Sequence, residues 1–90
     1  MSKYEIERMA REAAERYNKY RAPEAMIKLL SVKDNAIEAL ISGSFCRSCG
    51  LYDWIEDYKY ELMDMIGTQI EIVYIEQVNE ESFKVKFKIK

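Results

Sequence analysis

The C-terminal stretch, residues 69–90, decides the fold class, and it reads QIEIVYIEQVNEESFKVKFKIK. Its second half alternates apolar residues with lysines, as Phe83, Lys84, Val85, Lys86, Phe87, Lys88, Ile89 and Lys90. Its first half also has a period of two, and a segment at 78–82 that is polar apart from Val78 separates the halves. Two alternating runs around a polar turn predict an antiparallel hairpin with strands at about 69–77 and 83–90.

The register of this hairpin sets which side chains share a face. We pair Val78 with Phe83 across the turn. This pairing places Tyr74 on the apolar face, opposite Phe87, because a strand presents alternate residues to the same side. The other face carries Lys84, Lys86 and Lys88. A two-stranded sheet is only marginally stable, so we expect helices to cover it or a second copy to extend it to four strands.

Helical periodicity precedes the hairpin. Residues 2–21 and about 51–66 place apolar side chains at steps of three and four, which predicts amphipathic helices. Ser2 and Glu5 have the spacing of a capping box at the start of the first helix. Gly67 follows the last apolar position of the helix at 51–66 and predicts its end.

The middle of the chain is ambiguous. We expect helices at about 23–31 and 34–42, with Pro23 in the first turn of one and Asp34 capping the other, or a single longer helix ending at Ser42. A DNA-reading helix-turn-helix is disfavoured because the stretch at 34–42 has no Arg or Lys. The expected fold is therefore α+β: a single compact domain, 1–90, with three or four N-terminal helices packed on a C-terminal antiparallel β-hairpin.

Composition excludes several function classes. The 90 residues include no His, which rules out Ser-His and Cys-His catalysis and any His-ligated metal site, so we expect a protein that is not an enzyme. The net charge of −2 does not suit a polybasic nucleic-acid binder. No apolar run is long enough for a membrane span, and the N-terminus has no apolar signal core, which predicts a cytoplasmic protein.

The predicted helix at 51–66 carries an acidic face. Helical spacing aligns four acids with one tyrosine beside them: Asp53, Asp57, Tyr60, Glu61 and Asp64. Like charges four residues apart destabilise a helix slightly, so helix stability does not explain them. They form either a solubilising face or a docking surface for a basic protein partner.

Lysines of the last strand offer a different interpretation. Lysine at the edge of a sheet prevents aggregation between sheets, and this is one reading of Lys84, Lys86 and Lys88. The alternative is a phosphate-contacting strip that binds nucleic acid. Against it, the predicted register leaves no aromatic residue on the lysine face for stacking with bases.

The remaining chemical motif is Cys46-x-x-Cys49. Two thiols at this spacing can form a disulfide, act in redox chemistry, or bind a zinc ion shared between subunits, since one chain has no further Cys or His ligands. A pair of packed small residues in a turn is the simpler interpretation.

The sequence thus favours a small non-enzymatic protein–protein interaction module, an adaptor or a virus-type inhibitor, that docks a basic partner through the acidic face. The alternatives are a nucleic-acid-binding accessory protein and a CxxC thiol or zinc protein. The chain holds seven Tyr, three Phe and one Trp, a large aromatic content for a small core. Surface aromatics commonly anchor interfaces, so we also expect a homodimer, through the strand at 69–77 or the first helix.

Overall fold

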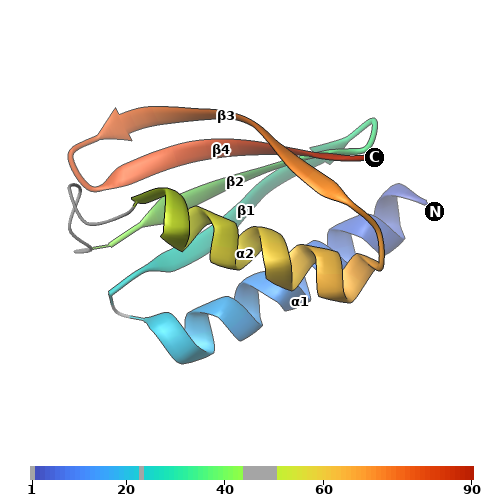
Figure 1. Cartoon of the computed structure of the whole chain (residues 1–90), viewed down its shortest axis with the longest axis horizontal. Coiled ribbons are helices and arrows are strands. Elements are labelled where there is room, and N and C mark those ends of the chain that lie inside the picture. Colours follow the sequence, from blue (N-terminus) through green and yellow to red (C-terminus); the bar gives the residue numbers. More distant parts are fainter. Residues whose placement is uncertain (1, 23, 44–50) are drawn as a thin grey trace.

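The computed structural model describes residues 2–22, 24–43 and 51–90 (Figure 1). Its elements follow in the order α1 (Lys3–Arg21), β1 (Met26–Lys33), β2 (Ala36–Ser42), α2 (Leu51–Ile66), β3 (Ile70–Asn79) and β4 (Ser82–Ile89). The strands form one four-stranded antiparallel sheet in the order β1-β2-β4-β3. Both helices lie against the same face of this sheet, and the other face is uncovered by the described elements (Figure 1).

The prediction of helices at 23–31 and 34–42 is wrong, because residues 26–42 form a β-hairpin. The prediction of three or four helices on a two-stranded hairpin is therefore wrong. The structure has two helices on a four-stranded sheet, and its overall class is α+β as predicted. The predicted helix start at Pro23 lies outside the described residues.

Two local features explain the hairpin at 26–42. Ile37, Ala39 and Ile41 alternate with less buried neighbours, which is the period of a strand with one buried face. Asp34 and Asn35 have positive φ angles of 50° and 64°. Positive φ at both central residues defines the tight turn that joins twisted antiparallel strands, and Asp and Asn tolerate this conformation. Asp34 therefore belongs to a hairpin turn and does not cap a helix.

The other two helices are confirmed. In α1, Ser2 is the N-cap, and its side-chain oxygen accepts a hydrogen bond from the Glu5 backbone N–H at 3.2 Å. In α2, the bounds Leu51–Ile66 match the predicted range. Gly67 follows α2 with a φ of 83°, and its N–H donates to the Met63 carbonyl at 2.8 Å. The chain can reverse there because glycine adopts positive φ at no steric cost.

The predicted hairpin at 69–77 and 83–90 exists as β3 and β4, but its register differs. Ile72 lies opposite Phe87, and Tyr74 lies opposite Lys86. A β-bulge between Ile72 and Tyr74 inserts Val73 as an extra residue. The bulge changes the parity of the strand, so Tyr74 lies on the lysine face and the prediction that it faces Phe87 is wrong.

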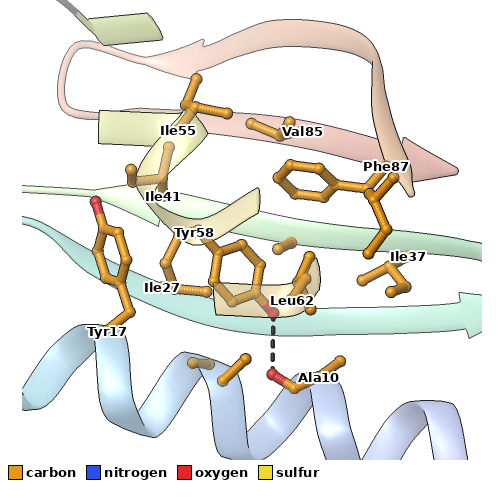
Figure 2. Close-up of a cluster of buried hydrophobic side chains, with 14 of the residues drawn as sticks. Ala10, Tyr17, Ile27, Ile37, Ile41, Ile55, Tyr58, Leu62, Val85 and Phe87 are labelled. Atoms are coloured by element: carbon orange, nitrogen blue, oxygen red, sulfur yellow. Dashed lines mark hydrogen bonds between the residues drawn. The ribbon is translucent and has the colours of Figure 1, made fainter. Parts of the chain in front are cut away.

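The core lies between the helices and the sheet (Figure 2). Tyr58 of α2 is its centre: its ring contacts Tyr17 and Phe87 edge-to-face, with centroids 6.0 and 5.5 Å apart. The Tyr58 hydroxyl donates to the Ala10 carbonyl of α1 at 3.0 Å, which satisfies a buried polar group (Figure 2).

No helix of the described residues has the length and hydropathy of a membrane span.

Candidate functional site

The lysine-bearing strand β4 is an interior strand of the sheet. It pairs with β2 on one side and with β3 on the other. Lys84, Lys86 and Lys88 therefore cannot guard a sheet edge, and the edge-protection interpretation is wrong. They stand along the middle of the uncovered face, at steps of about 6.8 Å, which is two residues of an extended strand.

The strand pairing arranges this uncovered face in three rows, each of which crosses all four strands. The central row joins Ser31, Glu38, Lys86 and Tyr74, and the flanking rows are Lys28, Leu40, Lys84 and Glu76, and Lys33, Ala36, Lys88 and Glu71. The rows together hold five lysines and three glutamates. We call this surface the lysine face. It is positive, although the whole chain has a net charge of −2.

A chain of hydrogen bonds follows the central row. The Tyr74 hydroxyl donates to Glu38 Oε2, and the Ser31 hydroxyl donates to Glu38 Oε1 at 3.2 Å. The hydrogen bond from Tyr74 lowers the pKa of Glu38 and raises the pKa of Tyr74. The hydrogen bond from Ser31 and the charges of Lys84 and Lys86 lower the pKa of Glu38 further. Glu38 is therefore a stable anion, and it holds Tyr74 as an aromatic group, 36 % exposed, on the lysine face.

A shallow hollow of about 510 Å³ lies on the same face, between the central row and one flanking row. Three basic side chains line it, Lys33, Lys86 and Lys88. The apolar side chains of Ala36 from β2 and Val73 from β3 also line it, and Ser31, Asp34 and Glu38 complete the lining. A hollow with lysines around apolar side chains can contact both the charged and the flat apolar parts of an anionic ligand.

The acidic side chains predicted as a docking surface lie on α2 beside α1. Arg16 forms ion pairs with Glu61 and Asp64, each at 3.5 Å, and Arg21 forms one with Asp57 at 3.4 Å. The structure thus gives three of the predicted carboxylates partners within the chain. Asp53 and Tyr60 are exposed on the same helix. Docking of a basic partner there stays a prediction.

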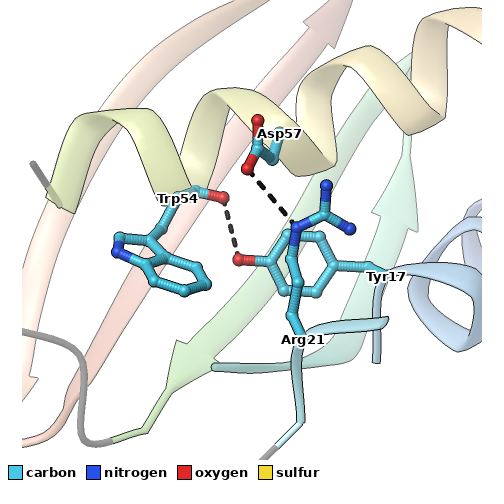
Figure 3. A network of polar contacts seen from close by, with 4 residues as sticks. All are labelled: Tyr17, Arg21, Trp54 and Asp57. Atoms are coloured by element: carbon cyan, nitrogen blue, oxygen red, sulfur yellow. Dashed lines mark hydrogen bonds and ion pairs between the residues drawn. The ribbon is translucent and has the colours of Figure 1, made fainter. Parts of the chain in front are cut away.

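Figure 3 shows how one of these pairs belongs to a network that holds the end of α1 against the start of α2. The Tyr17 hydroxyl donates to the Trp54 carbonyl at 2.9 Å. The Arg21 guanidinium lies 4.5 Å from the centre of the Tyr17 ring and bonds Asp57 (Figure 3). Burial raises the pKa of Tyr17, and the Arg21 charge partly offsets this effect. This network has a clear structural role.

Both residues of the cysteine motif, Cys46 and Cys49, lie outside the described residues. The disulfide, redox and shared-zinc hypotheses therefore stay predictions. Within the ranges 2–22, 24–43 and 51–90, no group of three or more acidic or thiol side chains is placed to hold a metal ion.

The sequence reasoning identified the lysines of β4 but missed Lys28, Lys33, Glu38 and Tyr74. Lys28 lies in the predicted helix at 23–31 and Lys33 lies between the two predicted helices, whereas in the structure both belong to β1 and follow Ile27 and Val32 on either side of a bulge. For Tyr74 the available signal was the isoleucine spacing: positions 70, 72 and 75 break the period of two by one residue. That break marks the bulge.

Comparisons of the chain with protein-family models, with curated protein sequences and with solved structures gave no match.

Proposed function

We propose that the chain is a non-catalytic binding module whose lysine face binds single-stranded nucleic acid. The observation that carries the proposal is the position of Lys84, Lys86 and Lys88, which form a row along an interior strand on the uncovered face of the sheet. Lysines at regular steps on an open face suit a linear polyanion, because each can neutralise one phosphate.

Tyr74 supplies the aromatic side chain that the predicted register did not place on the lysine face. Proteins that bind single strands combine a positive surface with aromatic side chains on which bases stack. The bulge at Val73 brings Tyr74 onto the same face as Lys86, which is its cross-strand partner. The described part of this face is a sheet surface without a protruding helix or ribbon that could enter a duplex groove, so it favours single strands over duplexes.

Three glutamates among five lysines limit the attraction. We therefore expect weak binding with a modest dependence on salt. Contacts from Lys84, Lys86 and Lys88 to three phosphates predict a slope of log K against log salt of about −2, from about −0.7 per phosphate on single strands.

Fluorescence anisotropy with a labelled oligothymidine, between about 50 and about 200 mM salt, tests the proposal. Lys84→Gln, Lys86→Gln and Lys88→Gln together should weaken binding by about tenfold or more and flatten the salt slope. A matched control removes three positive charges from α1, as Lys3→Gln, Arg8→Gln and Lys19→Gln, all exposed. The proposal fails if low salt gives no saturable binding, or if the control loses as much affinity.

Tyr74 variants separate stacking from charge. Tyr74→Phe keeps the ring and loses the bond to Glu38. It should bind at least as well as the unmodified protein, whereas Tyr74→Ala should bind about tenfold more weakly, because one base–aromatic stack contributes about 1–3 kcal/mol. Equal affinities for the Phe and Ala variants would contradict a stacking role.

A further inference from the structure

The two edges of the sheet differ in how they are closed. On the β1 edge, the Asn18 side chain of α1 bonds both backbone groups of Ile27. Its Oδ1 accepts from the Ile27 N–H at 2.7 Å, and its Nδ2 donates to the Ile27 carbonyl at 3.0 Å. An amide in this position occupies the hydrogen-bonding groups that a further strand would need.

The β3 edge presents backbone groups that face away from the sheet. The Ile89 N–H donates to the Asn35 carbonyl at 2.8 Å, so it points away from β3. Ile70 lies opposite Ile89. Ile70 and Ile89 therefore form a non-hydrogen-bonded pair, in which both residues direct their N–H and C=O groups away from each other. The backbone groups of Ile70, and of Ile72 two residues further, therefore point to the open edge, where Figure 1 shows β3 as the outermost strand.

The side chains along this edge specify a strand of particular chemistry. Glu71 and Glu76 are exposed on the uncovered face, and Ile72 and Ile75 are only partly buried on the helix face. In a strand added beside β3, the side chains on one face would lie next to the two glutamates, and those on the other face would lie next to the two isoleucines. Charge complementarity requires basic residues beside the glutamates, and burial favours apolar residues beside the isoleucines.

The protein already shows this pairing on the other side of β3. There, β4 places Lys88 and Lys84 opposite Glu71 and Glu76. It places Phe87 and Val85 opposite Ile72 and Ile75. The Lys84 ammonium lies 3.8 Å from the Glu76 carboxylate, which stays accessible to a second cation.

The geometry points to β3 as a docking edge for an extended segment of a partner protein that alternates apolar and basic residues. The segment adds a fifth strand to the sheet. A second copy does not fit this edge as well: its β3 would bring two glutamates against two others, and its β1 edge is closed by Asn18. Docking at this edge is independent of nucleic-acid binding, because the docking site is the backbone edge of β3, whereas the proposed nucleic-acid site is the row of lysines on β4.

A labelled peptide with the sequence FKVKFKIK, that of residues 83–90, is a direct probe. We expect saturable binding of this peptide and none of the charge-reversed peptide FEVEFEIE. Glu71→Lys with Glu76→Lys should weaken binding by about tenfold or more. The control, Glu15→Lys with Glu24→Lys, makes the same change of charge at exposed positions away from the edge and should alter affinity by less than about twofold.

Amide hydrogen exchange on the unmodified protein locates the peptide and does not depend on any variant folding. Binding should slow exchange at the amides of Ile70 and Ile72 while β4 keeps its own protection. Unchanged exchange at both amides, or equal loss of affinity in the control variant, would overturn the inference. A mass that rises with concentration without peptide would also overturn it, since the edge would then be occupied by another copy.

Discussion

The buried Tyr58 hydroxyl predicts a pH-dependent reversal in stability between this protein and Tyr58→Phe. At neutral pH the hydroxyl donates to the Ala10 carbonyl at 3.0 Å in a fully buried site. A hydrogen bond of this kind contributes about 1 kcal/mol to the free energy of unfolding. The Phe variant keeps the ring contacts with Tyr17 and Phe87, so we expect it to be less stable by about 1 kcal/mol at about pH 8.

Alkaline pH acts in the opposite direction. Burial raises the pKa of Tyr58 in the folded protein above the value of about 10 that it has when unfolded. Above about pH 10 the unfolded chain therefore releases a proton that the folded chain retains, and stability falls by about 1.4 kcal/mol per pH unit. By about pH 11 the accumulated loss is about 1.4 kcal/mol, which exceeds the contribution of the hydrogen bond. The Phe variant does not have this loss and should become the more stable protein.

Urea unfolding of both proteins, followed by circular dichroism between about pH 8 and pH 11, measures the difference directly. The other titrating groups are common to the two proteins and cancel in this comparison, including Tyr17, whose pKa burial also raises. At about pH 8 the expected gap corresponds to about 4–8 °C in the melting temperature of a domain of this size. A gap that keeps its sign and size up to about pH 11 would refute the assignment of Tyr58 as a buried, hydrogen-bonded phenol.

Two further predictions concern backbone contacts. At Gly43, where φ is 151°, an added Cβ would lie 2.1 Å from the Glu24 carbonyl oxygen. Gly43→Ala should therefore cost about 2 kcal/mol or more, against about 1 kcal/mol for Gly67→Ala, where φ is 83° and nothing lies within 4 Å; equal urea midpoints for the two variants would contradict this. Asn18→Ala removes both bonds to Ile27 and should cost about 1–2 kcal/mol. It should also make the mass measured by light scattering increase with concentration, whereas a constant mass would show that Asn18 does not close this edge.

Local signals were sufficient where one pattern dominated. Ser2 and Glu5 fixed the start of α1, and Gly67 marked the end of α2, because capping and chain reversal depend on adjacent residues only. The alternation at 83–90 identified β4 for the same reason. The acids of α2 could be aligned on one face from helical spacing alone, but nothing local to α2 indicated that Arg16 and Arg21 of α1 would pair with them.

The segment 26–42 could not be assigned locally. Short apolar runs suit either a helix or a strand, and the stretch from Ile37 to Ile41 satisfies both periods. The sheet decided the outcome, since β2 bonds to β1 on one side and to β4 on the other. In that position Ile37 and Ile41 are fully buried against the helices. The turn at Asp34 and Asn35 was the one local clue, and it becomes decisive only once strands flank it.

The lysine face is likewise a product of tertiary structure. The sequence alone determined that Lys84, Lys86 and Lys88 share one side of a strand. Whether that strand is an edge or an interior strand depends on its partner β2, whose residues lie 40 or more positions earlier in the chain than the β4 residues they pair with. The bulge at Val73 then decided that Tyr74 joins the lysines. Local sequence fixes the direction of a side chain only relative to its own strand, whereas neighbours, register and coverage come from long-range pairing and packing.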